Sequence, residues 1–335
     1  MITDVRPCAD PEFEIVAPGF VDLQVNGHDD VDVATADAAG WRRLGELLTA
    51  QGVTSWCPTL VSAPLDVLDR RLARVADHAA SGADVVGVHL EGPFLGTQHG
   101  AHTNVAAGPV DLGWLAGLPE TVAIVTLGPE CEGAGAAIAL LGSRGVVAAL
   151  GHTAATAEQV EAAVDAGATL FTHVFNASGA LHQREPGAIG AALTDDRLAV
   201  SLIADGHHLD ARIVDLVFRA KPAGKVVLVS DAVGWRSGRL GEADIALVDG
   251  APRLPDGTLA GSALTMDGAV RFCVHEAGID LEHALRAASA NPAAVVGLDD
   301  RGSITPGRRA DLVALSPGLT VDRTWVGGQP AGSGS

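Results

Sequence analysis

The sequence predicts a (β/α)8 barrel. Its 335 residues lie within the range of a single barrel with insertions, and 47% of them are hydrophobic, enough for a large core. Short β-type runs alternate with helix-type runs along most of the chain, an order typical of parallel sheets. Eight of the β-type runs are mostly apolar throughout, as expected for strands that are covered on both faces.

The eight expected strands lie in chain order between residues 20 and 232. They are FVDLQVN (20–26), VTSWCPTL (53–60), ADVVGVHLE (83–91), TVAIVTLG (121–128), GVVAALGH (145–152), TLFTHVFN (169–176), LAVSLIADG (198–206) and GKVVLVSDA (224–232). Helix-type segments follow five of them, near 37–51, 64–80, 132–145, 156–167 and 209–220. The other two gaps, after 91 and after 176, open with long loops.

The rest of the chain departs from this repeat. A hairpin insertion is expected near 245–262, with Asp256-Gly257 as its turn. Residues 281–298 are expected to form a helix that is stopped or bent at Pro292. Short strands in 305–330 are expected to pair with 1–17 in a small, reduced β appendage, which leaves 18–304 for the barrel.

Charge and composition exclude several classes of partner. The chain carries 22 basic and 41 acidic residues, a net charge of −19, which argues against nucleic acid and against anionic membranes. An anionic substrate would therefore need a local positive charge in its site. We expect no signal peptide and no membrane helix, and four scattered cysteines without paired spacing indicate a reduced, cytoplasmic protein.

Ionisable side chains recur where the expected strands end. Glu91 ends the third strand, His152 the fifth and His173 the sixth, while Asp231 lies at the end of the eighth. In a (β/α)8 barrel the carboxyl ends of the strands meet at one mouth, which is where active sites are found. A single histidine is more often an ordinary core or surface residue, but this repeated placement favours one shared site.

These residues suit a metal-dependent hydrolase. Glu91, His152 and His173 supply a carboxylate and two imidazoles, a ligand set for Zn²⁺ or a similar divalent ion with open positions for water. Asp231 is then placed as the general base for a metal-activated water. His89 shares a strand face with Glu91, and we expect it to support the ligands, with direct metal binding as the alternative.

Nine stretches, in order over roughly 17–315, resemble the N-acetylglucosamine-6-phosphate deacetylases of the amidohydrolase superfamily. They are PGFVDLQVNG, GVHLEGPFL, GAHTN, LGHTAAT, THVFNA, REPG, ADGHHLD, VSDA and LAGSALTM. The resemblance implies the metal ligands and the acid/base role of Asp231 given above, and it implies that His102 contacts the substrate and polarises the acetyl carbonyl. It also implies substrate-binding roles for Ala101, Asn176, Ala177, Arg184, His208, Leu259, Ala260 and Gly261.

The reaction that the resemblance implies is hydrolysis of the acetamide of N-acetyl-D-glucosamine 6-phosphate to glucosamine 6-phosphate and acetate. Arg184 would clamp the phosphate, since its planar fork matches phosphate oxygens. One divalent ion per subunit is expected, with zinc first and iron, cobalt or manganese as alternatives. Gln24 and Asn26 stand where many amidohydrolases place two histidines that hold a second metal, and amides bind such ions poorly. A homodimer is implied as well.

Three alternatives stay open at this stage. The substrate could be N-acetylgalactosamine 6-phosphate, or an acetamido sugar of secondary metabolism. The chain could also be a non-catalytic homologue that only binds a sugar phosphate. The presence of Glu91, His152, His173 and Asp231 together counts against the third, because a binding protein does not need the whole set.

Overall fold

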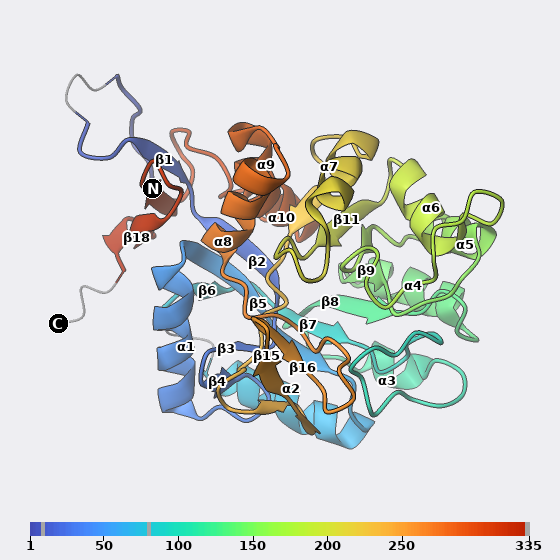
Figure 1. The fold of residues 1–335 in the computed structure, drawn as a ribbon. Coiled ribbons are helices and arrows are strands. Elements are labelled where there is room, and N and C mark those ends of the chain that lie inside the picture. Colours follow the sequence, from blue (N-terminus) through green and yellow to red (C-terminus); the bar gives the residue numbers. More distant parts are fainter. Residues whose placement is uncertain (8–10, 79–81, 332–335) are drawn as a thin grey trace.

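Eight parallel strands form a nearly closed barrel in the computed structural model, which describes residues 1–7, 11–78 and 82–331 (Figure 1). The predicted fold class is confirmed. The barrel strands are β2 (Phe20–Val25), β5 (Val53–Val61), β7 (Val88–Glu91), β8 (Val122–Leu127), β9 (Val147–Leu150), β10 (Leu170–Phe171), β11 (Ala199–Leu202) and β12 (Val226–Leu228). Each lies within one of the expected runs or extends it by one residue. A short strand, β6 (Asp84–Val85), pairs with β5 beside β7.

The barrel closes between β2 and β12, although no regular ladder joins these two strands. Val25 forms an isolated parallel bridge with Ala232, and the Asp231 N–H donates to the Gln24 carbonyl at 2.9 Å. The buried Asp22 carboxylate spans the same seam, because its Oδ1 accepts from the backbone N–H groups of Gln24 and Ser230, both at 3.2 Å. A side chain thus replaces part of the missing strand pairing.

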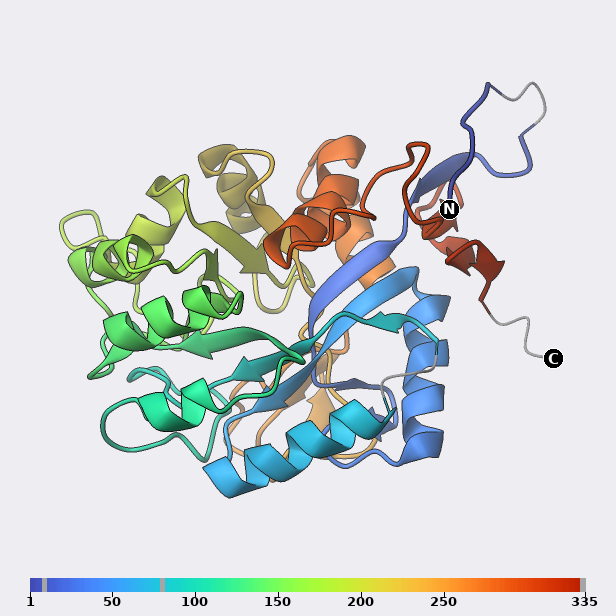
Figure 2. The same cartoon turned by 180° about the vertical axis from the view of Figure 1, so that it is seen from behind.

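Helices cover the outside of the barrel (Figure 2). They are α1 (Ala38–Ala50), α2 (Leu65–His78), α3 (Leu112–Ala116), α4 (Ala134–Ser143), α5 (Ala157–Asp165), α6 (Gly187–Thr194), α7 (Ala211–Ala220), α8 (Met266–Arg271), the π-helix η1 (Phe272–Glu276), α9 (Leu281–Ala288) and α10 (Ala290–Val295). Their apolar faces pack on the outward side chains of the strands, as Trp41 and Leu44 of α1 do. A second apolar cluster contains Leu23, Cys57, Ile124 and residues from four other strands, which can meet only inside the barrel.

A four-stranded antiparallel sheet stands beside the barrel, and the N-terminus lies next to it (Figure 1). Its order is β1 (Ile15–Pro18), β17 (Leu312–Leu315), β18 (Val321–Val326) and β19 (Gln329–Pro330). The N-terminal and C-terminal segments therefore pair as the sequence suggested. The division into an appendage of 1–17 with 305–330 and a barrel of 18–304 stays a prediction, and residues 8–10 of it lie outside the described part.

The insertion after β12 contains two hairpins rather than one. They are β13 (Arg239–Leu240) with β14 (Ala243–Asp244), and β15 (Ala246–Val248) with β16 (Ala251–Arg253). Asp249 and Gly250 form the turn of the second hairpin, both with positive φ, as an Asp-Gly turn requires. Asp256-Gly257 forms a separate tight turn in which the Leu254 N–H donates to the Thr258 carbonyl. The turn expected at Asp256-Gly257 is present and closes an antiparallel bridge between Arg253 and Leu259, while the longer hairpin of β15 and β16 turns seven residues earlier.

The helix expected after the insertion is present in two parts. The helix over 281–298 is interrupted at Ser289, so the break precedes Pro292, which lies in the first turn of α10, where a proline is tolerated. A further hairpin, which the sequence did not predict, pairs β3 (Gly27–His28) with β4 (Val31–Asp32) and follows β2 directly.

Among the described residues Cys57, Cys131 and Cys273 carry free thiols, while Cys8 lies outside them. Within the same residues, no helix has both the length and the apolar character that crossing a membrane would require.

Candidate metal centre and active site

Three side chains meet at the carboxyl-end mouth of the barrel. Glu91 is the last residue of β7, and His152 and His173 lie two residues beyond β9 and β10. His152 Nε2 and His173 Nε2 lie 3.1 and 2.9 Å from Glu91 Oε1 and 3.1 Å from each other. One ligand atom from each residue lies within 4.8 Å of the others, and all three residues are buried. This group could hold a metal ion, as its residue types predicted.

The hydrogen bonds around His152 suit metal binding. Its Nδ1 lies 3.1 Å from the Gln98 carbonyl oxygen, which can only accept, so Nδ1 carries the proton. The lone pair of Nε2 is therefore directed at the point that Glu91 and His173 share. Metal-binding histidines usually donate the N–H of their other ring nitrogen to a protein acceptor in this way. The donor set and its orientation fit a divalent cation.

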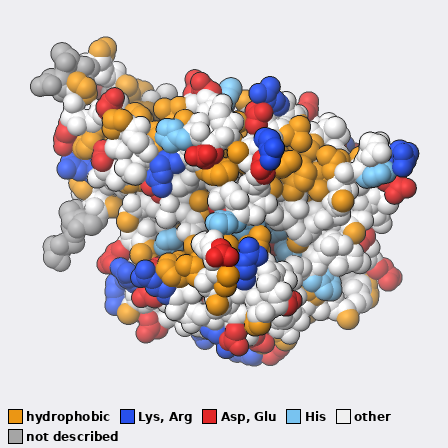
Figure 3. All heavy atoms as spheres, in the orientation of Figure 1, with side chains coloured by type: hydrophobic (Ala, Val, Ile, Leu, Met, Phe, Trp, Pro, Cys, Tyr) orange, Lys and Arg blue, Asp and Glu red, His pale blue; other side chains and the backbone are white. Residues whose placement is uncertain are grey.

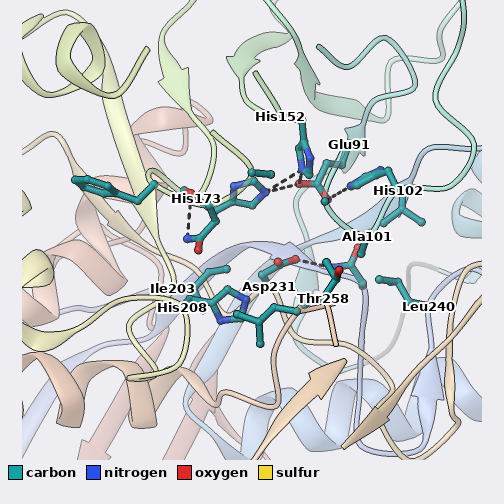
Figure 4. Close-up of a pocket in the computed structure, with 18 residues that line it drawn as sticks. Glu91, Ala101, His102, His152, His173, Ile203, His208, Asp231, Leu240 and Thr258 are labelled. Atoms are coloured by element: carbon teal, nitrogen blue, oxygen red, sulfur yellow. Dashed lines mark hydrogen bonds and ion pairs between the residues drawn. The ribbon is translucent and has the colours of Figure 1, made fainter. Parts of the chain in front are cut away.

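Asp231 faces this group across the cavity (Figure 4). Its Oδ1 accepts from two side-chain amides, Asn26 Nδ2 at 2.7 Å and Gln24 Nε2 at 3.1 Å. Gln24 Nε2 also donates to Glu91 Oε1 at 2.9 Å. The side-chain amides of Gln24 and Asn26 thus bind the two carboxylates of the site.

The electrostatics of the site reflect two buried carboxylates at close range. Burial, together with the charge of Glu91, holds the pKa of Asp231 well above its ordinary value. Burial alone would also raise the pKa of Glu91, but its contacts with the rings of His102, His152 and His173 hold it well below its usual range. Burial lowers the pKa of His152 to about 4, which keeps its ring neutral and able to bind a metal.

His102 lies on the other side of Glu91, with its Nε2 at 3.5 Å from Oε2 (Figure 4). Its ring packs edge-on against His152, with the ring centroids 4.4 Å apart. His89, in contrast, is engaged elsewhere: its Nδ1 lies 3.1 Å from the Leu23 carbonyl and its Nε2 lies 2.7 Å from Thr126 Oγ1. These contacts fit the expected supporting role of His89.

The backbone is strained where the site residues leave the strands. His152, His173 and Asp231 have φ values of 51°, 31° and 49°, in a left-handed region that residues with a Cβ seldom adopt. Such strain costs about 1–3 kcal/mol per residue and persists only where the surroundings enforce it. Its concentration at three of the four central residues supports a functional role for this end of the barrel.

A cavity of about 260 Å³ opens onto this group. The size suits a small molecule, and the face of the protein seen in Figure 3 carries histidine side chains near its middle. Eleven of the thirteen residues singled out from the sequence line the cavity. They are Glu91, Ala101, His102, His152, His173, Asn176, Ala177, His208, Asp231, Leu259 and Gly261.

The other two residues do not line it. Ala260 is fully buried and packs in a small apolar cluster with Val233 and with Leu240, which itself lines the cavity. Arg184 is exposed on the loop before α6, where its backbone N–H donates to His182 Nδ1 at 3.4 Å. His208, which does line the cavity, pairs through Nδ1 with the Asp205 carboxylate at 2.7 Å.

Sequence reasoning missed seven residues that line the cavity. They are Asn26, Val61, Gly100, Phe175, Ile203, Leu240 and Thr258. Gly100, Phe175 and Asn26 stand inside or beside motifs that were already recognised, so proximity to those motifs could have found them. Thr258 likewise stands directly before LAGSALTM, whereas Leu240 belongs to a part of the insertion where no sequence pattern indicates which side chains face the mouth.

Comparisons with known proteins agree with the geometry. Residues 141–331 match the amidohydrolase family. The chain is 40% identical to an N-acetylglucosamine-6-phosphate deacetylase of Danio rerio, over 96% of this chain and 85% of that protein. It is 39% identical to an N-acetylgalactosamine-6-phosphate deacetylase of Escherichia coli O157:H7, over 95% of this chain and 88% of that protein.

Solved structures of the same kind superpose closely. The N-acetylglucosamine-6-phosphate deacetylase of Thermotoga maritima matches with a TM-score of 0.90 and 34% identity, covering 98% of this chain and 91% of that one. A variant of the Mycobacterium smegmatis enzyme, in complex with N-acetyl-D-glucosamine-6-phosphate, matches with a TM-score of 0.89 and 36% identity, covering 94% and 86%.

Proposed function

The chain belongs to the amidohydrolase family, among the deacetylases of amino-sugar 6-phosphates, and from this premise we propose that it hydrolyses the acetamide of N-acetyl-D-glucosamine 6-phosphate. The products are glucosamine 6-phosphate and acetate. The observation that carries the proposal is the buried group of Glu91, His152 and His173 with Asp231 opposite it in one cavity.

Asp231 moves the proton in this reaction. Its Oδ1 is held by Gln24 and Asn26, which leaves Oδ2 to take a proton from the attacking water. The same carboxyl then delivers the proton to the departing amine, so that the amine leaves neutral. The raised pKa of Asp231 suits a group that must hold a proton between these two steps.

Glu91, His152 and His173 are the residues that would hold one divalent ion per subunit, with zinc first and iron, cobalt or manganese as alternatives. When bound, the ion would supply Lewis-acid activation of the water and of the amide carbonyl. His102 lines the cavity beside Glu91, His152 and His173. From there its ring can donate a hydrogen bond to the carbonyl oxygen of the acetamide, where negative charge develops in the transition state.

The remaining lining residues are proposed to bind the sugar and its phosphate. Ala101, Asn176, Ala177, Leu259 and Gly261 form the wall of the cavity, and His208 adds a ring that Asp205 orients. Ala260 supports this wall from behind. We propose that Arg184 reaches the phosphate when substrate is bound, and Arg184→Ala should then raise KM for phosphorylated substrates with little change in kcat. An unchanged KM removes this role.

A second candidate substrate is N-acetylgalactosamine 6-phosphate. The E. coli relative of that name is 39% identical to this chain, almost the same as the first N-acetylglucosamine-6-phosphate relative. The two sugars differ only in the orientation of one hydroxyl, and overall identity does not distinguish between them. An acetamido sugar of secondary metabolism, or sugar-phosphate binding without catalysis, has no specific observation in its favour.

The proposal is tested by acetate release from a panel of acetamido sugars, each with and without the 6-phosphate, on zinc-loaded protein. We expect the highest kcat/KM with N-acetyl-D-glucosamine 6-phosphate. A higher value with the galacto epimer selects the second candidate. Binding of the sugar phosphates without any acetate release would overturn the proposed deacetylase activity. It would favour the alternative of a non-catalytic protein that only binds a sugar phosphate.

Two further properties are proposed with the function. We expect a homodimer, which light scattering on the purified protein checks, and a cytoplasmic location, which fractionation of the source cells checks. A monomer, or activity in an exported fraction, would contradict them.

A further inference from the structure

We propose that Ser62 is a positioning residue that fixes His102 in the tautomer protonated at Nε2, so that His102 serves as a hydrogen-bond donor rather than as a base or a metal ligand. This inference rests on the proposed function for its role in catalysis. Ser62 directly follows β5, is only 5% exposed and is absent from the lining of the cavity.

Three contacts place Ser62 between His102 and Glu91. Its backbone N–H donates to His102 Nδ1 at 3.3 Å, and its Oγ lies 3.0 Å from the same nitrogen. Its hydroxyl also reaches the Glu91 carbonyl oxygen, at 3.2 Å. One short residue thus contacts the ring of His102 and the backbone of the central carboxylate.

The backbone contact decides the tautomer. A peptide N–H can only donate, so Nδ1 of His102 must accept, and a nitrogen that accepts carries no proton. The ring is then neutral, with its single proton on Nε2. That atom faces the site, 3.5 Å from Glu91 Oε2.

A different arrangement would use the hydroxyl alone. The ring could carry its proton on Nδ1 and donate to Ser62 Oγ, and the Ser62 hydroxyl would then donate its hydrogen bond to the Glu91 carbonyl. The Ser62 N–H would then point at a protonated nitrogen and lose its acceptor, at the cost that a buried unpaired donor carries. We therefore favour the Nε2–H form.

The tautomer separates three roles for His102. With the proton on Nε2, the ring can donate to the carbonyl oxygen of the acetamide and stabilise the developing negative charge. With the proton on Nδ1, the free lone pair of Nε2 would make the ring a base or a further metal ligand. Ser62 is itself no candidate nucleophile, because its hydroxyl is enclosed behind the cavity wall.

The space for the Ser62 hydroxyl depends on the residue after Glu91. A Cβ at Gly92 would lie 2.2 Å from Ser62 Oγ, which is closer than atoms can approach. Gly92 also has a φ of +90°, which glycine adopts readily. The end of β7 is therefore built with room for this hydroxyl.

The direct test is the protonation state of the His102 ring by two-bond ¹H–¹⁵N correlation NMR on histidine-labelled protein. The spectra are recorded without metal and with zinc, and the His102→Gln variant assigns the signals. We expect protonated Nε2 and unprotonated Nδ1 in both states. Protonated Nδ1, a doubly protonated ring, or a zinc-induced shift typical of coordination at His102 Nε2 would overturn the proposal.

The kinetic test compares Ser62→Ala and Ser62→Thr with Ser289→Ala, which removes another buried hydroxyl, bonded to the Leu285 carbonyl at 2.6 Å. Ser62→Ala keeps the backbone N–H, and with it the tautomer, but loses the hydroxyl contact that helps to align the ring. This loss of alignment should lower kcat on the order of 10-fold, with KM and zinc content unchanged. Ser62→Thr, which retains the hydroxyl, should restore most of kcat, and Ser289→Ala should leave it unaltered.

Wild-type kcat in Ser62→Ala, or no recovery in Ser62→Thr, contradicts the positioning role. Because NMR on the wild-type protein needs no substrate, the tautomer is decided even if the protein deacetylates no sugar. In that outcome the proposed function fails and the assignment of His102 stands or falls on the spectrum alone.

Discussion

Asp231 is the residue whose chemistry can be removed with the least disturbance of the site. In Asp231→Asn the amide oxygen can replace Oδ1 and still accept from Gln24 and Asn26. The side chain can no longer take a proton, so kcat should fall about 10²–10⁴-fold while zinc is retained. Acetate release and metal analysis check this, and near wild-type turnover in the zinc-loaded variant would rule out the proton-transfer role.

Asp22 gives the protein a pH-dependent stability that is independent of the metal ligands. Burial raises the pKa of Asp22 from 3.8 to about 6. Because the folded state holds this proton more tightly than the unfolded state, the contribution is present below the unfolded pKa and is lost as the pH rises through about 6. A shift of about 2 pKa units corresponds to at most about 3 kcal/mol in the free energy of unfolding.

Asp22→Asn tests this account, since an amide cannot ionise. The stability of the variant relative to the wild type should increase between about pH 4 and about pH 6 and then level off. Urea unfolding of both proteins across this range measures the difference, in which the titration of groups remote from Asp22 cancels. A difference that does not change with pH would show that Asp22 titrates normally.

At the scale of elements, the sequence was sufficient for the barrel strands and for the residues at their ends. A mostly apolar run in a parallel sheet marks a strand, and the polar residue where the run stops marks the mouth; Glu91, His152 and His173 follow this pattern. This pattern lies within a few consecutive residues, so it can be recognised in a single sequence. For the same reason these three residues could be assigned to one site before any contact was known.

Other features depend on contacts that no local pattern encodes. The sequence offers two Asp-Gly pairs, at 249–250 and 256–257, and the pairing of β15 with β16 decides which one closes the hairpin. Helix α6 was missed because it lies beyond a long loop, and its run GAIGAALT is too short and too uniformly apolar to show a helical period. Ser62 was missed because its importance lies in two partners 29 and 40 residues away.

The end of β7 allows a prediction with a matched control. Gly92→Ala places a Cβ 2.2 Å from Ser62 Oγ, whereas Gly108→Ala meets nothing within 4 Å; the two glycines have similar φ values of +90° and +95°. Gly108→Ala should therefore cost only the backbone strain, about 1–3 kcal/mol. Gly92→Ala should cost more and should also weaken zinc binding through Glu91. Urea unfolding and zinc titration measure both, and equal effects of the two substitutions would contradict the steric account.

For the whole molecule, Arg301 links the barrel to the four-stranded sheet. Its side chain is 7% exposed and lies between Asp84, beside the barrel, and Asp311, which precedes β17. Nη1 donates to Ser55 Oγ at 2.8 Å and to Asp84 Oδ2 at 2.9 Å. The two parts of the fold are thus joined by a largely buried charge as well as by apolar packing.

Arg301→Leu should lower the free energy of unfolding by about 2–3 kcal/mol, because it leaves buried polar groups without a partner. The control is Arg219→Leu, which breaks the exposed pair with Asp215 and should cost less than about 1 kcal/mol. Urea unfolding of both variants makes the comparison. Similar small losses would show that the link contributes nothing to stability.

The central claim for the molecule is that Glu91, His152 and His173 hold a single divalent ion at the mouth of the barrel. The most direct test is titration of metal-free protein with zinc, with the stoichiometry read by calorimetry and by metal analysis. We expect one ion per chain in the wild type and in His208→Asn, and loss of this binding in His152→Asn and His173→Asn. Two ions per chain in the wild type would contradict the claim, and so would zinc binding that persists in each of the two single variants, His152→Asn and His173→Asn.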